Sequence, residues 1–192
     1  MNDLKDLATA RQSLIKDRTA AKARAQTATV PLLKAQCCRR LKQIEQDLTQ
    51  VEAAILSVIA QDAALSESAE ILTSIPGIAT VTACAMLTET PELGKLSGKQ
   101  AASLAGLAPM SRQSGKWQGR EHIRGGRAEM RRSLYLPAAV ATRFNPDLKA
   151  KYEQLVASGK CKKLAIAAIM RKLLVMANSL LRDRKEWTKV HA

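Results

Sequence analysis

Residues 104–132 read LAGLAPMSRQSGKWQGREHIRGGRAEMRR, and the interpretation of the whole chain starts from this stretch. It contains five glycines, which let a backbone turn sharply and approach a ligand closely. It also contains seven basic side chains against two acids, Glu121 and Glu129. Such a concentration of positive charge favours a polyanionic ligand. We therefore predict that nucleic acid contacts Arg112, Gly115, Lys116, Arg120, Arg124, Arg127, Arg131 and Arg132.

The composition predicts a mainly α-helical protein. Of the 192 residues, 46% are hydrophobic and only 3% are aromatic, so the core is expected to consist of Ala, Leu, Ile and Val. Alanine-rich chains with few glycines favour helices. The net charge of +14 is uneven, because residues 1–66 carry ten Lys and Arg against seven acids, whereas residues 67–192 carry twenty-one against ten. A polyanion is therefore expected to contact mainly the second part.

The cysteines and histidines show no metal-binding pattern. The four cysteines form no CxxC pair, and the two histidines are far apart in the sequence. We therefore predict neither a metal site nor a disulfide framework.

We recognise no signal peptide and no apolar run of membrane-spanning length. The chain is expected to be cytoplasmic, with reduced thiols and no membrane partner.

Residues 1–66 are predicted to form a first domain, a hairpin of two helices. In residues 3–28 Leu and Ala recur at intervals of three and four, and Pro31 interrupts the pattern because proline disfavours helix at the preceding residue. From Leu41 to Val58 apolar residues alternate at three and four, as in a coiled-coil seam. We expect an antiparallel coiled-coil extension, or pairing with a second copy. The alternative is an ordinary amphipathic helix packed on the rest of the protein.

Residues 67–192 are predicted to form a compact helical domain that begins with a helix-hairpin-helix. Two short helices are expected to meet at the sequence Pro76-Gly77-Ile78-Ala79. A glycine turn that leads into a helix leaves N–H donors unpaired beside the positive end of the helix dipole, so Pro76 and Gly77 are predicted to contact phosphate. The motif usually has a second glycine where Ala79 stands. The alternative is a tight turn that serves only helix packing.

Local signals indicate the remaining elements. Ser97 and Gln100 have the spacing of a capping box, which would open a short helix. Residues 105–126 are expected to form a largely irregular Gly/Arg-rich loop, in which a short hairpin could turn at Gln118-Gly119. Further helices are predicted over residues 127–143, 147–157 and 162–181, and Pro137 is expected to kink the first of them.

Several motifs together resemble one known family. They resemble the C-terminal transposase domain of bacterial insertion-sequence transposases, a family that includes Piv-type DNA invertases and bridge-RNA-guided recombinases. The close resemblance covers residues 67–181, and residues 1–60 match the coiled coil of the family more loosely. The motifs are ILTSIPGIATVTACAMLTE at 71–89, Gly-Leu-Ala-Pro at 106–109, Gln-Ser-Gly at 113–115, and the glycine pair at 125–126 followed by an Arg-rich helix start.

The resemblance implies a catalytic serine. The domain in this family carries a serine before glycine that acts as a nucleophile on DNA, and this position falls on Ser114. A serine hydroxyl needs activation, for which His122 is the nearby candidate base. Arg112 and Arg124 could stabilise negative charge on the phosphate that is transferred.

The resemblance also carries over to the start of the following helix. Arg131 and Arg132 fall on the basic positions that the family has there. The chain departs from the family at Arg127, where asparagine is common after the glycine pair.

The resemblance implies a partner domain as well. Members of the family have a RuvC-like DEDD domain with four acidic metal ligands, which is expected to bind Mg²⁺. We recognise no such domain in this sequence, and its acids do not assemble into a carboxylate cluster, so no metal-binding residue is predicted. The implied partners are DNA, a guide RNA in RNA-guided members, a separate RuvC-like domain, and a second copy through the coiled coil.

Three functions therefore remain open at this point. The chain could be the DNA-binding part of a transposase or recombinase that supplies a serine nucleophile for DNA transposition. It could be a non-catalytic helix-hairpin-helix nucleic-acid-binding protein, a remnant or regulator of a mobile element. It could also be a coiled-coil oligomerisation module.

Overall fold

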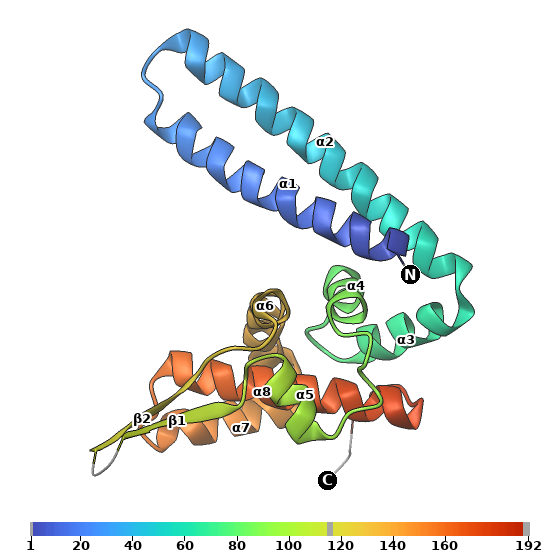
Figure 1. The fold of residues 1–192 in the computed structure, drawn as a ribbon, viewed down its shortest axis with the longest axis vertical. Helices are drawn as coiled ribbons and strands as arrows, with labels where there is room; N and C mark the ends of the chain where they lie inside the picture. Colours follow the sequence, from blue (N-terminus) through green and yellow to red (C-terminus); the bar gives the residue numbers. More distant parts are fainter. Residues whose placement is uncertain (1, 115–116, 190–192) are drawn as a thin grey trace. The chain divides into compact units, whose positions relative to one another are not determined.

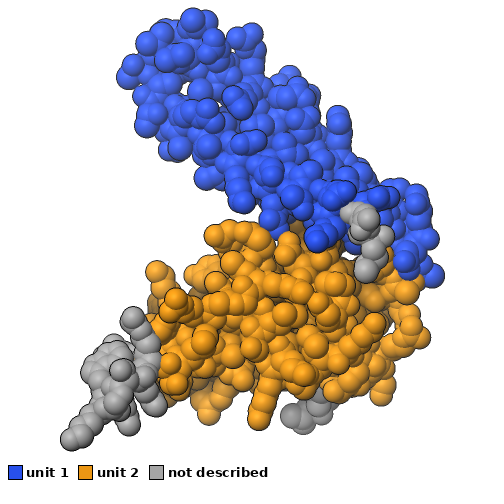
Figure 2. Space-filling model, in the orientation of Figure 1, with its two compact units in different colours: residues 1–63 blue, residues 64–192 orange. Residues whose placement is uncertain are grey.

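The computed structural model describes residues 2–114 and 117–189; for residues 2, 112–114, 117, 118 and 120 the description is of the backbone. Within these residues eight α-helices and one two-stranded sheet follow one another (Figure 1). They divide into two compact units, residues 1–63 and residues 64–192, which Figure 2 colours separately. The predicted mainly helical fold class is confirmed. The division lies close to the boundary expected from the sequence, although the independence of two domains stays a prediction.

The first unit is a hairpin of two long helices, α1 (Asn2–Thr27) and α2 (Pro31–Gln61), which pack side by side (Figure 1). Pro31 occupies the start of α2, where its fixed φ and missing N–H suit a helix. Ala21 of α1 is buried together with Ile44 and Leu48 of α2, so apolar residues of the heptad seam do face the other helix. Supercoiling of the pair and its association with a second copy stay predictions.

The second unit is built from helices and one small hairpin. Helices α3 (Ala63–Ser74), α4 (Thr80–Glu89) and α5 (Gly98–Leu104) precede strands β1 (Pro109–Ser114) and β2 (Trp117–Ile123). Helices α6 (Ala128–Phe144), α7 (Pro146–Ala157) and α8 (Lys162–Asp183) follow. Helix α8 contacts α5, α6 and α7, and α4 contacts α6. The unit is therefore organised around α6 and α8.

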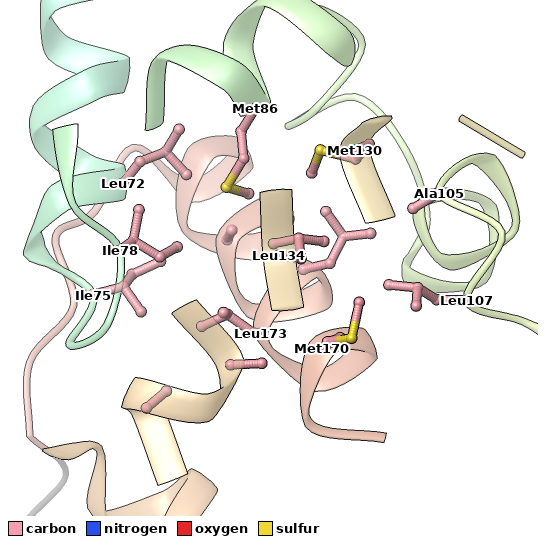
Figure 3. Close-up of a cluster of buried hydrophobic side chains, with 14 of the residues drawn as sticks. Leu72, Ile75, Ile78, Met86, Ala105, Leu107, Met130, Leu134, Met170 and Leu173 are labelled. Atoms are coloured by element: carbon pink, nitrogen blue, oxygen red, sulfur yellow. The ribbon is translucent and has the colours of Figure 1, made fainter. Parts of the chain in front are cut away.

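The apolar core of the second unit confirms this organisation. Leu134 of α6 and Leu173 of α8 are fully buried, and Met86 of α4 and Leu107 after α5 join them (Figure 3).

Helix α8 is also long and apolar enough to cross a membrane, with a mean hydropathy of 1.7 over its most apolar 18 residues, so the expectation that no such run exists is wrong. Its length and composition carry little weight, because the same helix supplies buried residues to this core.

A buried amide attaches the loop before α5 to α8. Asn178 is 2% exposed; its Oδ1 accepts a hydrogen bond from the Gly94 N–H at 2.9 Å, and its Nδ2 donates to the Leu96 carbonyl at 2.7 Å. The loop then enters α5 through the predicted capping box, which is confirmed by reciprocal bonds between Ser97 and Gln100. One side chain thus satisfies two backbone groups in a segment without regular structure.

Replacing Asn178 by alanine tests this attachment. We expect Asn178→Ala to lower the free energy of unfolding by about 2–3 kcal/mol. Two hydrogen bonds are lost, and the Gly94 N–H and the Leu96 carbonyl stay partly buried without these partners. Urea unfolding followed by circular dichroism measures the change. Ser179→Ala is the matched control, since the Ser179 hydroxyl bonds to the exposed side chains of Arg182 and Asp183, and we expect less than about 0.5 kcal/mol. Equal losses in the two variants would contradict the proposed role of Asn178.

Candidate nucleic-acid interface

The stretch singled out by the sequence forms an antiparallel β-hairpin. Its register places Met110 opposite His122 at one end and Ser114 opposite Trp117 at the other. Figure 1 shows the hairpin extending from the helices of the second unit. Ser114 is therefore the last residue of β1, at the end of the hairpin that is furthest along the strands from α5 and α6.

Gln118 and Gly119 lie within β2, paired with Gln113 and Arg112, so the predicted turn position and the largely irregular loop are wrong. Gly119 lies within β2 opposite Arg112, next to an irregularity in the register between Met110 and Arg112. Glycine inside a strand often marks such an irregularity. Gly115 and Lys116, two of the predicted contact residues, lie outside the described residues.

The Gly-Leu-Ala-Pro motif ends α5 and begins the hairpin. Gly106 has φ +66°, and its N–H donates to the Ser103 carbonyl at 2.9 Å, while the Leu107 N–H donates to the Ala102 carbonyl at 2.8 Å. These two bonds form a Schellman motif, in which a left-handed residue closes a helix. Leu107 is 2% exposed and attaches this end to the core, and Pro109 then starts β1.

The two ends of the hairpin meet through glycine backbones. A Cβ on Gly126 would lie 2.2 Å from the backbone nitrogen of Gly106 and 2.6 Å from the Leu104 carbonyl oxygen. A Cβ on Gly106 would lie 2.1 Å from the Gly125 carbonyl oxygen. The Arg127 N–H donates to the Leu104 carbonyl at 2.7 Å. We call this contact, made by residues 104–106 and 125–127, the hairpin base.

Two arginines of the stretch are bound within the hairpin base. Arg131 Nη1 donates to the Gly125 carbonyl at 2.7 Å and to the Ala105 carbonyl at 3.3 Å, so one guanidinium holds both sides. Arg127 donates to both carboxylate oxygens of Glu92 at 2.7 Å, and its Nη1 also donates to the Glu89 carbonyl at 2.6 Å. The structure thus gives these arginines a role in the fold, and their contact with nucleic acid stays a prediction.

The Arg127–Glu92 ion pair changes the acidity of its carboxyl group. The hydrogen bonds from Arg127 lower the pKa of Glu92 to about 2 from an ordinary 4.5, and they raise the pKa of Arg127. The two side chains are 34% and 43% exposed, so solvent screens part of this interaction. Sequence reasoning missed Glu92, because it lies 35 residues before Arg127 and no local pattern marks it.

The remaining predicted basic residues lie along or beside the hairpin. Arg112 belongs to β1 and Arg120 to β2, and Arg124 is exposed just after β2. Arg132, in the first turns of α6, forms an ion pair with Glu129. The hairpin therefore brings together part of the predicted set, and nucleic-acid contact by these residues stays a prediction.

Pro76 and Gly77 form the turn between α3 and α4. Gly77 has φ +106°, and a Cβ there would lie 2.8 Å from the Pro137 carbonyl oxygen of α6. This close approach favours the packing alternative, because the glycine is needed against a neighbouring helix. Residues 79–81, where α4 begins, are exposed. A phosphate contact at this turn, and the helix-hairpin-helix assignment itself, stay predictions.

The candidate base His122 is far from Ser114. Met110, opposite His122, is four residues before Ser114 on β1, which corresponds to roughly 13 Å along a strand. This is too far for a direct proton transfer, so the hypothesis that His122 activates Ser114 is wrong for this hairpin. Among the described residues no group of three or more His, Cys, Asp or Glu could hold a metal ion.

Comparison with known proteins identifies the family. Residues 69–153, which include α4, α5 and the whole hairpin, match the model of the IS116/IS110/IS902 transposase family. This chain carries a transposase domain of the IS116/IS110/IS902 family. The predicted resemblance to insertion-sequence transposases and DNA invertases is thereby confirmed.

The relatives of the transposase domain include invertases and insertion-element proteins. Pilin gene-inverting proteins of Moraxella bovis and Moraxella lacunata are each 30% identical over 184 residues, which is 93% of this chain and 55% of theirs. A 43.6 kDa protein of insertion element IS110 from Streptomyces coelicolor is 30% identical over 145 residues, which is 73% of this chain and 36% of the relative. The chain thus spans about half the length of the pilin gene-inverting proteins.

The glycine pair of the transposase domain allows a matched test of the hairpin base. Gly126→Ala is expected to lower the free energy of unfolding by about 3 kcal/mol or more, because left-handed strain adds to a steric clash with Gly106. Gly125 has φ +71° and open space around its Cβ position, so Gly125→Ala is expected to cost only about 1–2 kcal/mol. Thermal unfolding of both variants measures the difference. Equal losses of unfolding free energy in Gly126→Ala and Gly125→Ala would show that the close approach of the glycine backbones does not constrain the hairpin base.

The ion pair predicts a pH-dependent contribution to stability. Because the pKa of Glu92 is about 2 in the folded chain and 4.5 ordinarily, the pair stabilises the fold above about pH 4.5, and this stabilisation is lost as the pH falls toward 2. We expect Glu92→Gln to lower the free energy of unfolding by about 1 kcal/mol at neutral pH, after allowance for solvent screening. The difference from wild type should vanish near pH 2.

The control for this prediction is Glu153→Gln. Glu153 faces Lys149 at 4.0 Å on an exposed surface, so we expect a loss below about 0.5 kcal/mol at neutral pH. Urea unfolding across the pH range gives both differences, and a carboxyl NMR titration gives the pKa of Glu92 directly. A Glu92 pKa near 4.5 would contradict the ion pair as the cause.

Proposed function

We propose that this chain is the DNA-binding part of an insertion-sequence transposase or recombinase and that Ser114 is its nucleophile. One observation carries the proposal: Ser114 ends β1, at the opposite end of the hairpin from the hairpin base. Close glycine contacts and two arginines hold the hairpin base together. A residue at the end of a hairpin can reach the backbone of a bulky duplex more readily than one among the core helices. Because the hairpin base is fixed, a residue at the other end of the hairpin can keep its position during attack.

The proposed step is a transfer of a DNA phosphodiester to serine. Ser114 Oγ bonds to the phosphorus, the bond from phosphorus to the 3′ oxygen breaks, and the serine proton leaves to a base while the departing oxygen takes a proton as a free 3′ hydroxyl. A neighbouring cation would stabilise the negative charge of this transition state, and Arg112, two residues before Ser114 on β1, is the residue we propose for it. Arg124 follows β2 beyond His122, so it is too far along the hairpin for this role. The base is not His122, given the register of the hairpin.

The proposal includes a partner domain. The described residues contain no group of acids fit to hold a metal ion, so a RuvC-like domain is proposed to bring the carboxylates and Mg²⁺. The Moraxella relatives are named for inverting a pilin gene, and gene inversion requires DNA strands to be broken and rejoined. We further propose a second copy of the chain and, as in RNA-guided members, a guide RNA as partners. Such a protein would act in the cytoplasm, where bacterial DNA lies.

Replacing Ser114 by alanine tests the nucleophile. Purified chain is incubated with duplex DNA and Mg²⁺, with and without a separately supplied RuvC-like domain from a relative. We expect a protein–DNA adduct that survives denaturant with wild type and the added domain. Ser114→Ala should remove it by a factor of at least about 10³ while salt-sensitive binding persists. Ser111→Ala is the control, since Ser111 is an exposed serine of the same strand, and it should leave the adduct unchanged.

The other outcomes separate the alternatives. Salt-sensitive DNA binding without any adduct would favour a non-catalytic nucleic-acid-binding protein. No DNA binding at all, together with self-association through α1 and α2, would favour an oligomerisation module. An adduct that persists in Ser114→Ala but disappears in Ser111→Ala would move the nucleophile to Ser111.

A further inference from the structure

We propose that a second surface of the same unit binds the sugar-phosphate backbone of a nucleic acid. The surface is a groove of about 620 Å³ between α5, α7 and α8, and α8 contacts each of the other two helices. Figure 1 shows these helices in the second unit. The inference rests on the proposed function, in that it assumes a nucleic acid as the partner. None of its residues belongs to the hairpin or its base. The charged residues that line the groove are all basic: Lys99, Lys151, Arg171 and Lys172.

The groove has a defined floor. Ala168, Arg171, Lys172 and Val175 line it from one face of α8, because residues spaced by three and four lie above one another on a helix. The first turn of α5 lies against this face at Gly98, where a Cβ would lie only 3.0 Å from Val175 Cγ1. The small residue thus lets α5 approach α8, which brings Lys99 to the same groove as the two cations of α8.

The positive charge of the groove is not neutralised within the described part of the chain. No carboxylate lines the groove, and none of the ion pairs between described residues involves its four cations. Lys151 Nζ donates to the neutral Gln154 Oε1 at 2.9 Å. Lys99 and Lys172 are exposed, and Lys151 and Arg171 are half-buried. Like charges gathered in a concave surface repel one another and concentrate a positive potential, which an anion would relieve.

A neighbouring groove shows what a neutralised cation looks like. The groove beside Leu96 and Gly126 has one lining cation, Arg127, and Glu92 binds it with two hydrogen bonds. Arg127 is therefore already paired with a carboxylate of the same chain. The four cations between α5, α7 and α8 have no such partner among the described residues, and this difference points to an external anion.

The lining also selects the part of the nucleic acid that would be bound. It contains no aromatic side chain on which a base could stack, and no Asn or Gln that could read a base edge. Lysine and arginine are the residues that neutralise phosphates and so bind the backbone without regard to sequence. The ligand is therefore a phosphodiester backbone, which duplex DNA or a folded RNA could present.

Salt dependence of binding tests the groove. The full chain is titrated with a labelled DNA duplex and, separately, with a folded RNA hairpin over a range of salt concentrations. In the groove variant the slope of log affinity against log salt should become shallower by up to about 3.6 on the duplex, because each lost phosphate contact removes about 0.9. The groove variant carries Lys99→Gln, Lys151→Gln, Arg171→Gln and Lys172→Gln.

A second variant and a control make the result decisive. Lys99→Gln with Lys172→Gln changes only exposed side chains and should lower the slope by about 1.8, even if the fourfold variant does not fold. The control removes the same charge from exposed lysines of the first unit and should change the slope by less than about 0.9. The control carries Lys16→Gln, Lys22→Gln, Lys34→Gln and Lys42→Gln.

Each outcome decides between the two proposals. A shallower slope on the duplex alone, on the RNA alone, or on both supports the groove and identifies its ligand. Wild-type binding with equal slopes in the groove and control variants overturns the groove and leaves the proposed function standing. Absence of salt-sensitive binding by wild type overturns both. Ser114→Ala should keep the wild-type slope, since the groove acts on binding and not on the chemical step.

Discussion

The backbones of two glycines approach each other so closely that neither position has room for a side chain. A Cβ on Gly126 would lie 2.2 Å from the nitrogen of Gly106, and one on Gly106 would lie 2.1 Å from the Gly125 carbonyl oxygen. This contact requires α5 to end in a left-handed residue and α6 to begin directly beside it. The two strands of the hairpin therefore start from fixed ends, and the position of Ser114 follows from the length of β1.

The positive charge of the second unit has two physical roles. Arg127 pairs with the Glu92 carboxylate, and Arg131 donates to backbone carbonyls of the hairpin base, so both contribute to the fold. Arg124 and the cations of the groove between α5, α7 and α8 have no carboxylate partner among the described residues, so they leave a positive potential toward solvent. The net charge of +14 already subtracts the carboxylates, but it does not say which cations are paired within the fold. The contacts of each cation within the fold separate the two sets.

The sequence likeness to the Moraxella relatives extends beyond residues 69–153, which match the family model. Those relatives match 93% of this chain, so the likeness includes α1 and α2 as well as the domain itself. The chain covers 55% of their length. The chemistry proposed for Ser114 depends on groups that the described residues do not provide, which is why the decisive experiment adds a second domain.

The sequence by itself determined the elements whose causes are local. The capping box at Ser97, the interruption before Pro31 and the apolar faces of the helices depend on neighbours within a turn or two, and each was predicted correctly. The hairpin turn was placed wrongly at Gln118-Gly119, because glycine also occurs at an irregular position inside a strand. Only the tertiary structure decided that Glu92 holds Arg127 and that four cations from three helices share one groove. These contacts join residues far apart in the chain, where no periodicity or spacing records them.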